Sequence, residues 1–198
     1  MAKSKKKKPQ QEFLSPERFM RERVRSLQLG PCYFPTEMDE RGEGIAIVSR
    51  VHTGGRVSFA VYLIDSWCTG VKDTYFRLRM EEDEFQSYVE RMGDHVRPAS
   101  YNEVHNLIYG ALEFAEEAGI PPHKDFAVTK YMLEEDTDDI PLIEYSYGKD
   151  GKHFLVVTGK LEASRYLQFM RRHLKEGEYD YIIALDPDEM DFSPEEDE

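Results

Sequence analysis

Two apolar segments joined by a pair of glycines form the clearest pattern along the chain. Residues 45–53 and 56–65 are rich in β-branched and aromatic side chains, and Gly54-Gly55 lies between them. Glycines suit a two-residue loop here, because a primed turn needs positive φ at its centre. The pattern predicts a β-hairpin in which Thr53 pairs with Arg56.

Pairing outward from that turn places Ile47 opposite Tyr62 on one face of the predicted hairpin and Val48 opposite Val61 on the other. Both faces are therefore apolar at the end away from the turn. This favours strands that lie inside a sheet and are covered on both sides there. We expect the end that carries Arg50 to emerge into solvent.

Further segments of the same residue types predict additional strands. The segment 32–34 favours a short edge strand, and 73–79 continues the meander. A second hairpin is predicted from 142–147 and 153–158, because Gly148-Lys149-Asp150-Gly151 between them is typical of a turn. A last strand is predicted at 179–185.

Apolar positions spaced by three and four predict five helices. The predicted helices are 16–27, 81–92, 101–118, 124–134 and 161–175. Ser15 precedes the first as a cap, and Ser100 with Glu103 forms a capping box for the third. Gly110 inside the third helix costs about 1 kcal/mol relative to alanine, so we expect another element to pack closely there.

Hairpins interleaved with helices indicate an α+β fold, with an antiparallel meander sheet packed against several helices. The chain has 198 residues, of which 40% are hydrophobic, which is enough for one core. We expect one domain over residues 12–185. Residues 1–11 and 186–198 are predicted to be a disordered basic arm and a disordered acidic tail.

Charge is distributed unevenly along the chain, whose net charge is -13. Residues 1–11 carry five lysines and no acid (+5), and residues 186–198 carry eight acids and no base (-8). The remainder is therefore -10, because -13 - 5 + 8 = -10. A body of this charge repels a phosphate backbone, so any binding of nucleic acid must be local.

The composition also bears on location and cofactors. The longest apolar run, Phe59 to Ile64, is too short to span a membrane, and the first lysines are not followed by the apolar segment of a secretory signal. We therefore expect a cytoplasmic protein that makes no membrane contact. Cys32 and Cys68 do not form a CxxC pair, so we expect two free thiols, no metal and no cofactor.

The basic arm and the first predicted helix are the first candidate for binding. Lys5, Lys6, Lys7 and Lys8 precede a helix on which Arg18, Arg21 and Arg25 share one face at spacings of three and four. Together these side chains could hold phosphates through salt-sensitive contacts. The alternative is that a lysine-rich end only keeps the chain in solution.

The second candidate consists of Cys68, His105, His123 and Asp125. Cys68 lies in a turn after a strand, and a histidine brought beside it could activate the thiol. His123 and Asp125 could contribute to a metal site, although the spacing supplies no complete ligand set. The alternatives are a buried cysteine, a hydrogen-bonded His105 at the edge of the core, and Asp125 as a helix cap.

Two stretches, 61–73 and 107–126, resemble a group of bacterial proteins that has no assigned activity. The resemblance rests on Val61-Tyr62-Leu63-Ile64-Asp65 through Gly70-Val71-Lys72-Asp73 and on Leu107-Ile108-Tyr109-Gly110-Ala111 through Pro122-His123-Lys124-Asp125-Phe126. It implies no site residue. It marks these two stretches as the first places to search.

The sequence contains no phosphate-binding GxxxxGK[ST] loop and no GxGxxG, GxSxG or HExxH motif. The leading hypothesis is a non-catalytic binding or adaptor protein whose arm and first helix engage RNA, a ribosome or an acidic protein. The alternative is a small hydrolase or nuclease in which Cys68, His105, His123 and Asp125 converge. Whether the protein is an enzyme stays open at this point.

Overall fold

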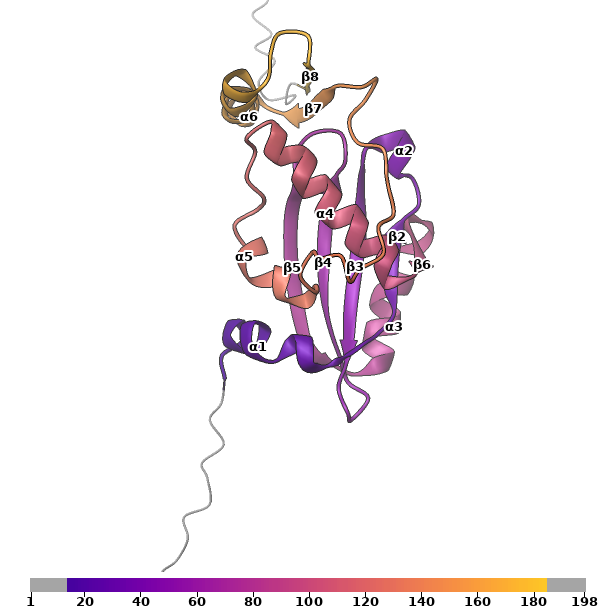
Figure 1. Cartoon of the computed structure of the whole chain (residues 1–198). Coiled ribbons are helices and arrows are strands. Elements are labelled where there is room, and N and C mark those ends of the chain that lie inside the picture. Colours follow the sequence, from indigo (N-terminus) through magenta and orange to yellow (C-terminus); the bar gives the residue numbers. More distant parts are fainter. Residues whose placement is uncertain (1–13, 185–198) are drawn as a thin grey trace, which may run out of the picture.

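A computed structural model describes residues 14–184 and confirms the α+β class. Its main sheet has six strands in the order β5-β4-β3-β2-β6, with β1 paired to β3, and every pairing is antiparallel (Figure 1). The strands are β1 Gln28–Leu29, β2 Cys32–Pro35, β3 Glu43–Val51, β4 Val57–Asp65, β5 Gly70–Met80 and β6 Val96–Ala99. The predicted arm 1–11 and tail 186–198 lie outside the described residues.

The helices of residues 14–184 mostly follow the predicted pattern. They are α1 Pro16–Glu22, α2 Met38–Arg41, α3 Glu82–Glu90, α4 Tyr101–Glu117, α5 Phe126–Thr129 and α6 Lys160–His173. Ser15 caps α1, and Ser100 with Glu103 forms the capping box of α4. The first and fourth predicted helices are shorter than expected, because each passes into a 3₁₀ turn, Val24–Ser26 and Lys130–Met132.

Helices cover both faces of the main sheet. On one face, side chains of α1, α4 and α5 pack against Ala46, Val48 and Tyr62 (Figure 1). On the other, Phe85 of α3 packs against Ile47 and Phe59. The expectation that both faces of the first hairpin are covered is confirmed.

The register of the first hairpin differs from the prediction by one residue. The loop holds three residues, because the His52 N–H donates to the Arg56 carbonyl, and Gly55 adopts a φ of 85° in it. Three-residue loops with a left-handed last residue are a common alternative to two-residue turns. Ile47 therefore lies opposite Val61 rather than Tyr62, so Tyr62 faces α4.

Two strand predictions are wrong. β2 is not an edge strand but pairs with β3 on one side and β6 on the other. The second hairpin does not form: residues 142–147 make no strand, and the turn after them makes a single bridge, Lys149 to Lys152. Tyr145 and Tyr147 instead pack against the core beside α4, and burial there replaces strand pairing.

Residues 133–148 form a strap along α4. The Asn106 amide donates to the Pro141 carbonyl at 3.1 Å and accepts from the Ile143 N–H at 3.0 Å. The Tyr147 hydroxyl lies 2.3 Å from the position where a Cβ on Gly110 would be. Gly110 therefore admits the strap, as the sequence predicted.

The last part of the chain forms a C-terminal unit of β7 His153–Thr158, α6 and β8 Tyr179–Ala184. β7 and β8 pair in parallel, with α6 as the connection between them. Leu155 and Leu167 of this unit pack with Ala115 and Ala118 at the end of α4 and with Cys68. These side chains form an apolar cluster separate from those on the two faces of the main sheet, and it attaches the C-terminal unit beyond the end of α4 (Figure 1).

Candidate functional site

The arginines of α1 and of the 3₁₀ turn after it do not form one uniform face. Arg18 pairs with Glu22 one turn later at 2.8 Å. Arg25 turns inward instead: its Nε donates to the Leu133 carbonyl at 2.7 Å, and it pairs with Glu135 at 2.9 Å. Arg25 therefore anchors the start of the strap, while Arg18 and Arg21 remain exposed.

A residue of β5 extends the positive charge beyond α1. The Arg79 guanidinium lies over the Phe19 ring at 4.9 Å, and the His52 ring stacks on Phe19 at 5.9 Å. Burial, with Arg79 and Arg56 nearby, lowers the pKa of His52. The exposed arginines Arg18, Arg21, Arg23 and Arg79 thus gather at one end of the main sheet, and we call this set the basic surface.

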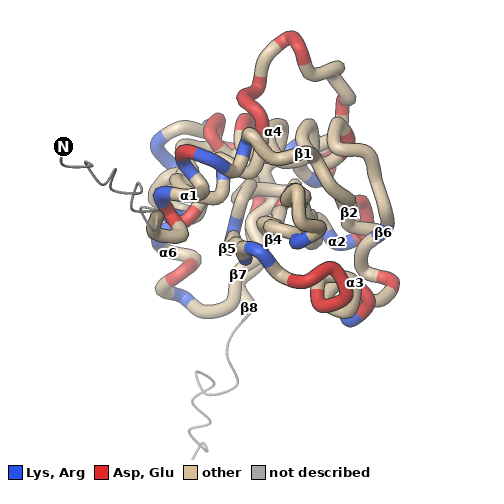
Figure 2. The backbone as a smooth tube through the Cα atoms, turned by 90° about the horizontal axis from the view of Figure 1, so that it is seen from below, with Lys and Arg blue, Asp and Glu red and all other residues tan. Residues whose placement is uncertain are grey.

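Figure 2 shows this distribution from below, with blue segments along α1 and red segments on α3 and on the long loop above α4. The helix that covers the opposite face of the sheet begins with Glu82, Asp83 and Glu84. The face that carries α1 also has acids, in the strap beside α4, where Glu135 pairs with Arg25. Lys5 to Lys8, the other part of this candidate, lie outside the described residues and come before α1 in the sequence.

The turn that contains Cys68 is held by Asp65. This carboxylate accepts hydrogen bonds from the N–H groups of Trp67, Cys68 and Thr69 and from the Thr69 hydroxyl. Burial raises the pKa of Asp65, although each of these bonds opposes the increase. All four bonds are within the turn, so Asp65 stabilises its shape.

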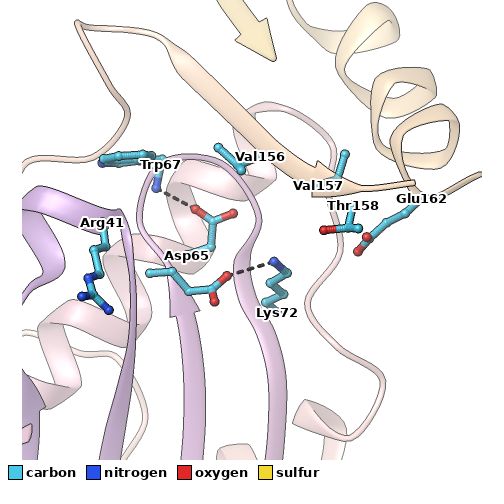
Figure 3. A pocket seen from close by; sticks show the side chains of 9 residues that line it. Arg41, Asp65, Trp67, Lys72, Val156, Val157, Thr158 and Glu162 are labelled. Carbon is cyan, nitrogen blue, oxygen red and sulfur yellow. Dashed lines mark hydrogen bonds and ion pairs between the residues drawn. The ribbon is translucent and has the colours of Figure 1, made fainter. Parts of the chain in front are cut away.

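A cavity of about 420 Å³ lies beside this turn, between the main sheet and the C-terminal unit. Figure 3 shows Arg41 and Glu162 on opposite sides of it, with Trp67 and Lys72 between them. Its cations already have partners: Lys72 pairs with Glu43 at 2.9 Å, and Arg41 pairs with Glu37 at 2.8 Å. The lining is polar, but Arg41, Lys72 and Asp65 already have ion-pair or hydrogen-bond partners.

Cys68 lies in an apolar setting. Its side chain is fully buried, and its sulfur lies 3.9 Å from the Met170 sulfur on α6. Burial, and to a smaller extent the Asp65 carboxylate, strongly raises the pKa of this thiol. Both effects favour the protonated thiol over the nucleophilic thiolate.

His105 lies between two tyrosines of α4, with ring centroids 5.4 Å from Tyr101 and 4.5 Å from Tyr109. Its Nε2 is 3.4 Å from the Glu134 carbonyl, and its buried Nδ1 has no hydrogen-bond partner among the described residues. Burial lowers the pKa of the ring, so the neutral imidazole is favoured. This histidine belongs to the contact between α4 and the strap.

His123 lies apart from these groups, with its Nδ1 3.6 Å from an Asp73 oxygen and 3.9 Å from an Asp125 oxygen. Within residues 14–184, no group of three or more His, Cys, Asp or Glu is placed to hold a metal ion. In the same part of the chain, no hydrogen bond joins Cys68 to either histidine. Of the four predicted residues, His123 and Asp125 are therefore neighbours, whereas Cys68 and His105 each have separate surroundings.

Arg50 is the side chain whose surroundings differ most from expectation. It is 1% exposed rather than in solvent, and its guanidinium makes four hydrogen bonds. The acceptors are the carbonyls of Arg25, Leu27 and Met132 and the Glu134 carboxylate. One sequence signal pointed to this position: Arg50 continues the alternation of Ala46 and Val48, which face the α4 side of the sheet.

Comparison with protein-family models, curated proteins and solved structures finds no match. Among residues 14–184, no helix combines the length and the apolar character that crossing a bilayer requires.

Proposed function

We propose that this chain is a cytoplasmic, non-catalytic binding protein that engages RNA through its lysine arm and its basic surface. The observation that carries the proposal is the position of Arg79 over Phe19, which adds a cation from β5 to those of α1. Basic residues from two separate segments thus converge at α1, the first helix after the five lysines in the sequence.

RNA fits this arrangement because a row of phosphates needs many cations and little geometric precision. The body without its ends carries a charge of -10, so it repels a polyanion everywhere except at such a local concentration of bases. The acidic first turn of α3 lies on the other face, and we expect it to orient the RNA towards α1.

The neighbourhoods of the candidate catalytic groups also support a binding role. Cys68 is buried among apolar side chains, and His105 is engaged between two tyrosines. His123 contacts Asp73 and Asp125 at the surface. The alternative hydrolase hypothesis stays a prediction, which fast alkylation of Cys68 in the folded protein would support.

The test is binding of single-stranded RNA over a range of salt concentrations, by the intact chain and by a chain without residues 1–11. We expect the truncated chain to bind more weakly and to show a shallower salt dependence. Each lost phosphate contact reduces the slope of log K against log salt by about 0.7. Equal binding by both chains would contradict the proposal.

Point variants distinguish binding at the basic surface from a general effect of positive charge. Arg79→Ala removes a cation of the basic surface, whereas Arg77→Ala removes an exposed arginine whose strand position faces the α3 side, opposite Phe59. We expect only Arg79→Ala to reduce RNA affinity and the salt slope. Binding to polyglutamate but not to RNA would instead assign the surface to an acidic protein partner.

A further inference from the structure

The C-terminal unit contains a sheet that is incomplete by the usual standards of parallel sheets. β7 and β8 form a sheet of two strands, whereas parallel strands normally lie in larger sheets with both faces covered. Only one face packs on α6 and the end of α4. Val156 and Ile182 on the other face are 43% and 54% exposed.

The outer edge of β8 is also open among the described residues. The ladder begins with the His153 N–H donating to the Glu178 carbonyl and ends with the Gly159 N–H donating to the Ala184 carbonyl. In a parallel ladder, alternate residues of a strand bond to one neighbour. Residues 180, 182 and 184 therefore bond to β7, and the backbone groups of Tyr179, Tyr181 and Ile183 point outward.

The outer edge of β7 differs, because the Phe154 N–H donates there to the Trp67 carbonyl at 2.9 Å. The open edge of β8 contains neither proline nor lysine, the residues that commonly block edge pairing. An added strand could therefore bind to β8 but not to the side of β7 beside the Trp67 turn.

We propose that the occupant of this edge is the β8 strand of a second copy of the chain, paired antiparallel. With Tyr181 at the two-fold axis, Tyr179 of each copy lies opposite Ile183 of the other, so all outward backbone groups find partners. The result is a continuous four-stranded sheet with two copies of β7 at its edges. Such a self-complementary contact has the symmetry of most homodimers.

Charge favours a second copy over an unrelated strand. Arg171, Arg172 and Lys175 at the end of α6 are exposed, and no ion pair within residues 14–184 involves them. The sequence beyond β8 carries eight acids in residues 186–198. The attraction between these cations and acids is strongest where they lie within a Debye length of about 8 Å.

The direction of pairing follows from where each strand ends. Ala184 bonds to Gly159, which precedes α6, so the acidic residues of one chain follow the end of β8 that is remote from its own α6 C-terminus. In an antiparallel pair, Ala184 of one copy comes beside the start of the other copy's β8, a few residues after that copy's basic α6 end. The second copy thus supplies the cations.

The first test measures the mass of the full chain in solution by light scattering and the dissociation constant of the dimer by sedimentation. Tyr181→Pro removes an outward N–H and the ring, whereas Tyr181→Ala removes only the ring. We expect the wild type and Tyr181→Ala to dimerise and Tyr181→Pro to dissociate at least about tenfold more readily, since each copy loses a hydrogen bond. A wild type that is monomeric at all concentrations would overturn the proposal.

A cross-link tests the register without weakening the strand. Tyr181→Cys places two cysteines opposite each other at the two-fold axis, within the Cα separation that a disulfide spans. We expect an intermolecular disulfide under mild oxidation. Leu161 is 87% exposed on α6, so Leu161→Cys is the matched control. It should dimerise without forming an intermolecular disulfide, because both native cysteines are buried. Equal cross-linking of both variants would contradict the register.

Removal of residues 186–198 tests the role of charge. We expect the dissociation constant of the dimer to rise, and the remaining association to lose its dependence on salt. Arg171→Glu with Arg172→Glu should produce the same loss in the full chain. A dimer unaffected by either change would show that charge does not select the second copy.

Discussion

The main sheet and the C-terminal unit solve the problem of burying strands in different ways. In the main sheet, β3 and β4 have neighbours on both sides and helices on both faces, so Ile47, Phe59 and Tyr62 are fully buried. In the C-terminal unit, β8 has one neighbour, and Ile182 on it is half exposed.

The difference indicates which region provides stability and which is available for association. Burial of apolar area is the main source of folding free energy, and a fully buried leucine or phenylalanine contributes about 1.5–3 kcal/mol. The main sheet concentrates such residues, while the C-terminal unit attaches through one smaller cluster. We therefore expect the C-terminal unit to open at a lower free energy than the main sheet.

The largest expected effect comes from Arg50→Met in the main sheet. The substitution leaves the buried Met132 carbonyl and the partly buried Arg25 and Leu27 carbonyls without this donor, and it removes the partner of Glu134. We expect the free energy of unfolding to fall by about 3–5 kcal/mol in urea titrations. Arg56→Met, which breaks an exposed pair with Glu81, is the control and should cost under about 1 kcal/mol. Similar losses for both would show that burial of Arg50 contributes little.

Leu155→Ala should separate the two regions. Leu155 is fully buried in the cluster that attaches the C-terminal unit, so its truncation should cost about 2–5 kcal/mol there. We expect faster amide hydrogen exchange in residues 153–184 and little change in β3 and β4. Val156→Ala on the exposed side of the same strand should change little. Equal acceleration in both regions would mean that they unfold as one cooperative unit.

Acidification should weaken the contact between α4 and the strap through His105. Burial lowers the pKa of this ring in the folded protein below its ordinary 6.5, so the unfolded chain binds more protons as the pH falls. The stability that neutral His105 provides is present above pH 6.5 and is lost as the pH falls towards the lowered value, by at most about 1.4 kcal/mol per pH unit.

The comparison for this prediction is His105→Phe, which keeps an aromatic ring beside Tyr109. Its free energy of unfolding should fall less between pH 7.5 and pH 5 than that of the wild type. His52, whose pKa is also lowered, remains in both proteins and cancels. If the free energy of unfolding falls equally with pH in the two proteins, His105 does not have this role.

The smallest expected effect is a difference in thiol labelling between the two regions. Burial raises the pKa of Cys32 in the main sheet to about 11 and also strongly raises that of Cys68, so each should react only when its surroundings open. With Cys32→Ser and Cys68→Ser as single-thiol variants, we expect Cys68 to react faster, because it depends on contact with α6. Labelling rates in urea-unfolded samples serve as the reference for the intrinsic reactivity of each thiol. Equal rates in the native state would show that the two regions do not differ in how readily they open.

Local signals in the sequence identified much of the fold. The capping box at Ser100 and Glu103, and the stripe of Ala163, Leu167 and Met170 on α6, predicted their helices, because caps and helical spacing depend on residues close in the chain. The first hairpin was also found. Its register was wrong, since a three-residue and a two-residue loop are both compatible with Thr53-Gly54-Gly55.

The site was less predictable than the fold. The sequence grouped Arg18, Arg21 and Arg25 by helical spacing, but Arg25 is held by the Leu133 carbonyl, more than a hundred residues away. Arg79 was not singled out, because only folding brings it over Phe19. The ring contact depends on how α1 packs against the end of β5, which no local pattern records.

The sequence by itself thus determined the α+β class, the main helices, the central hairpin and the opposite charges of the chain's two ends. Only the tertiary structure decided that Arg50 is buried, that β7 pairs with β8 in parallel, and that residues 142–147 run along α4 instead of forming a strand. The physical reason is that caps, turns and periodicity act over a few residues. Strand partners and buried ion pairs instead depend on distant groups whose burial satisfies their hydrogen bonds.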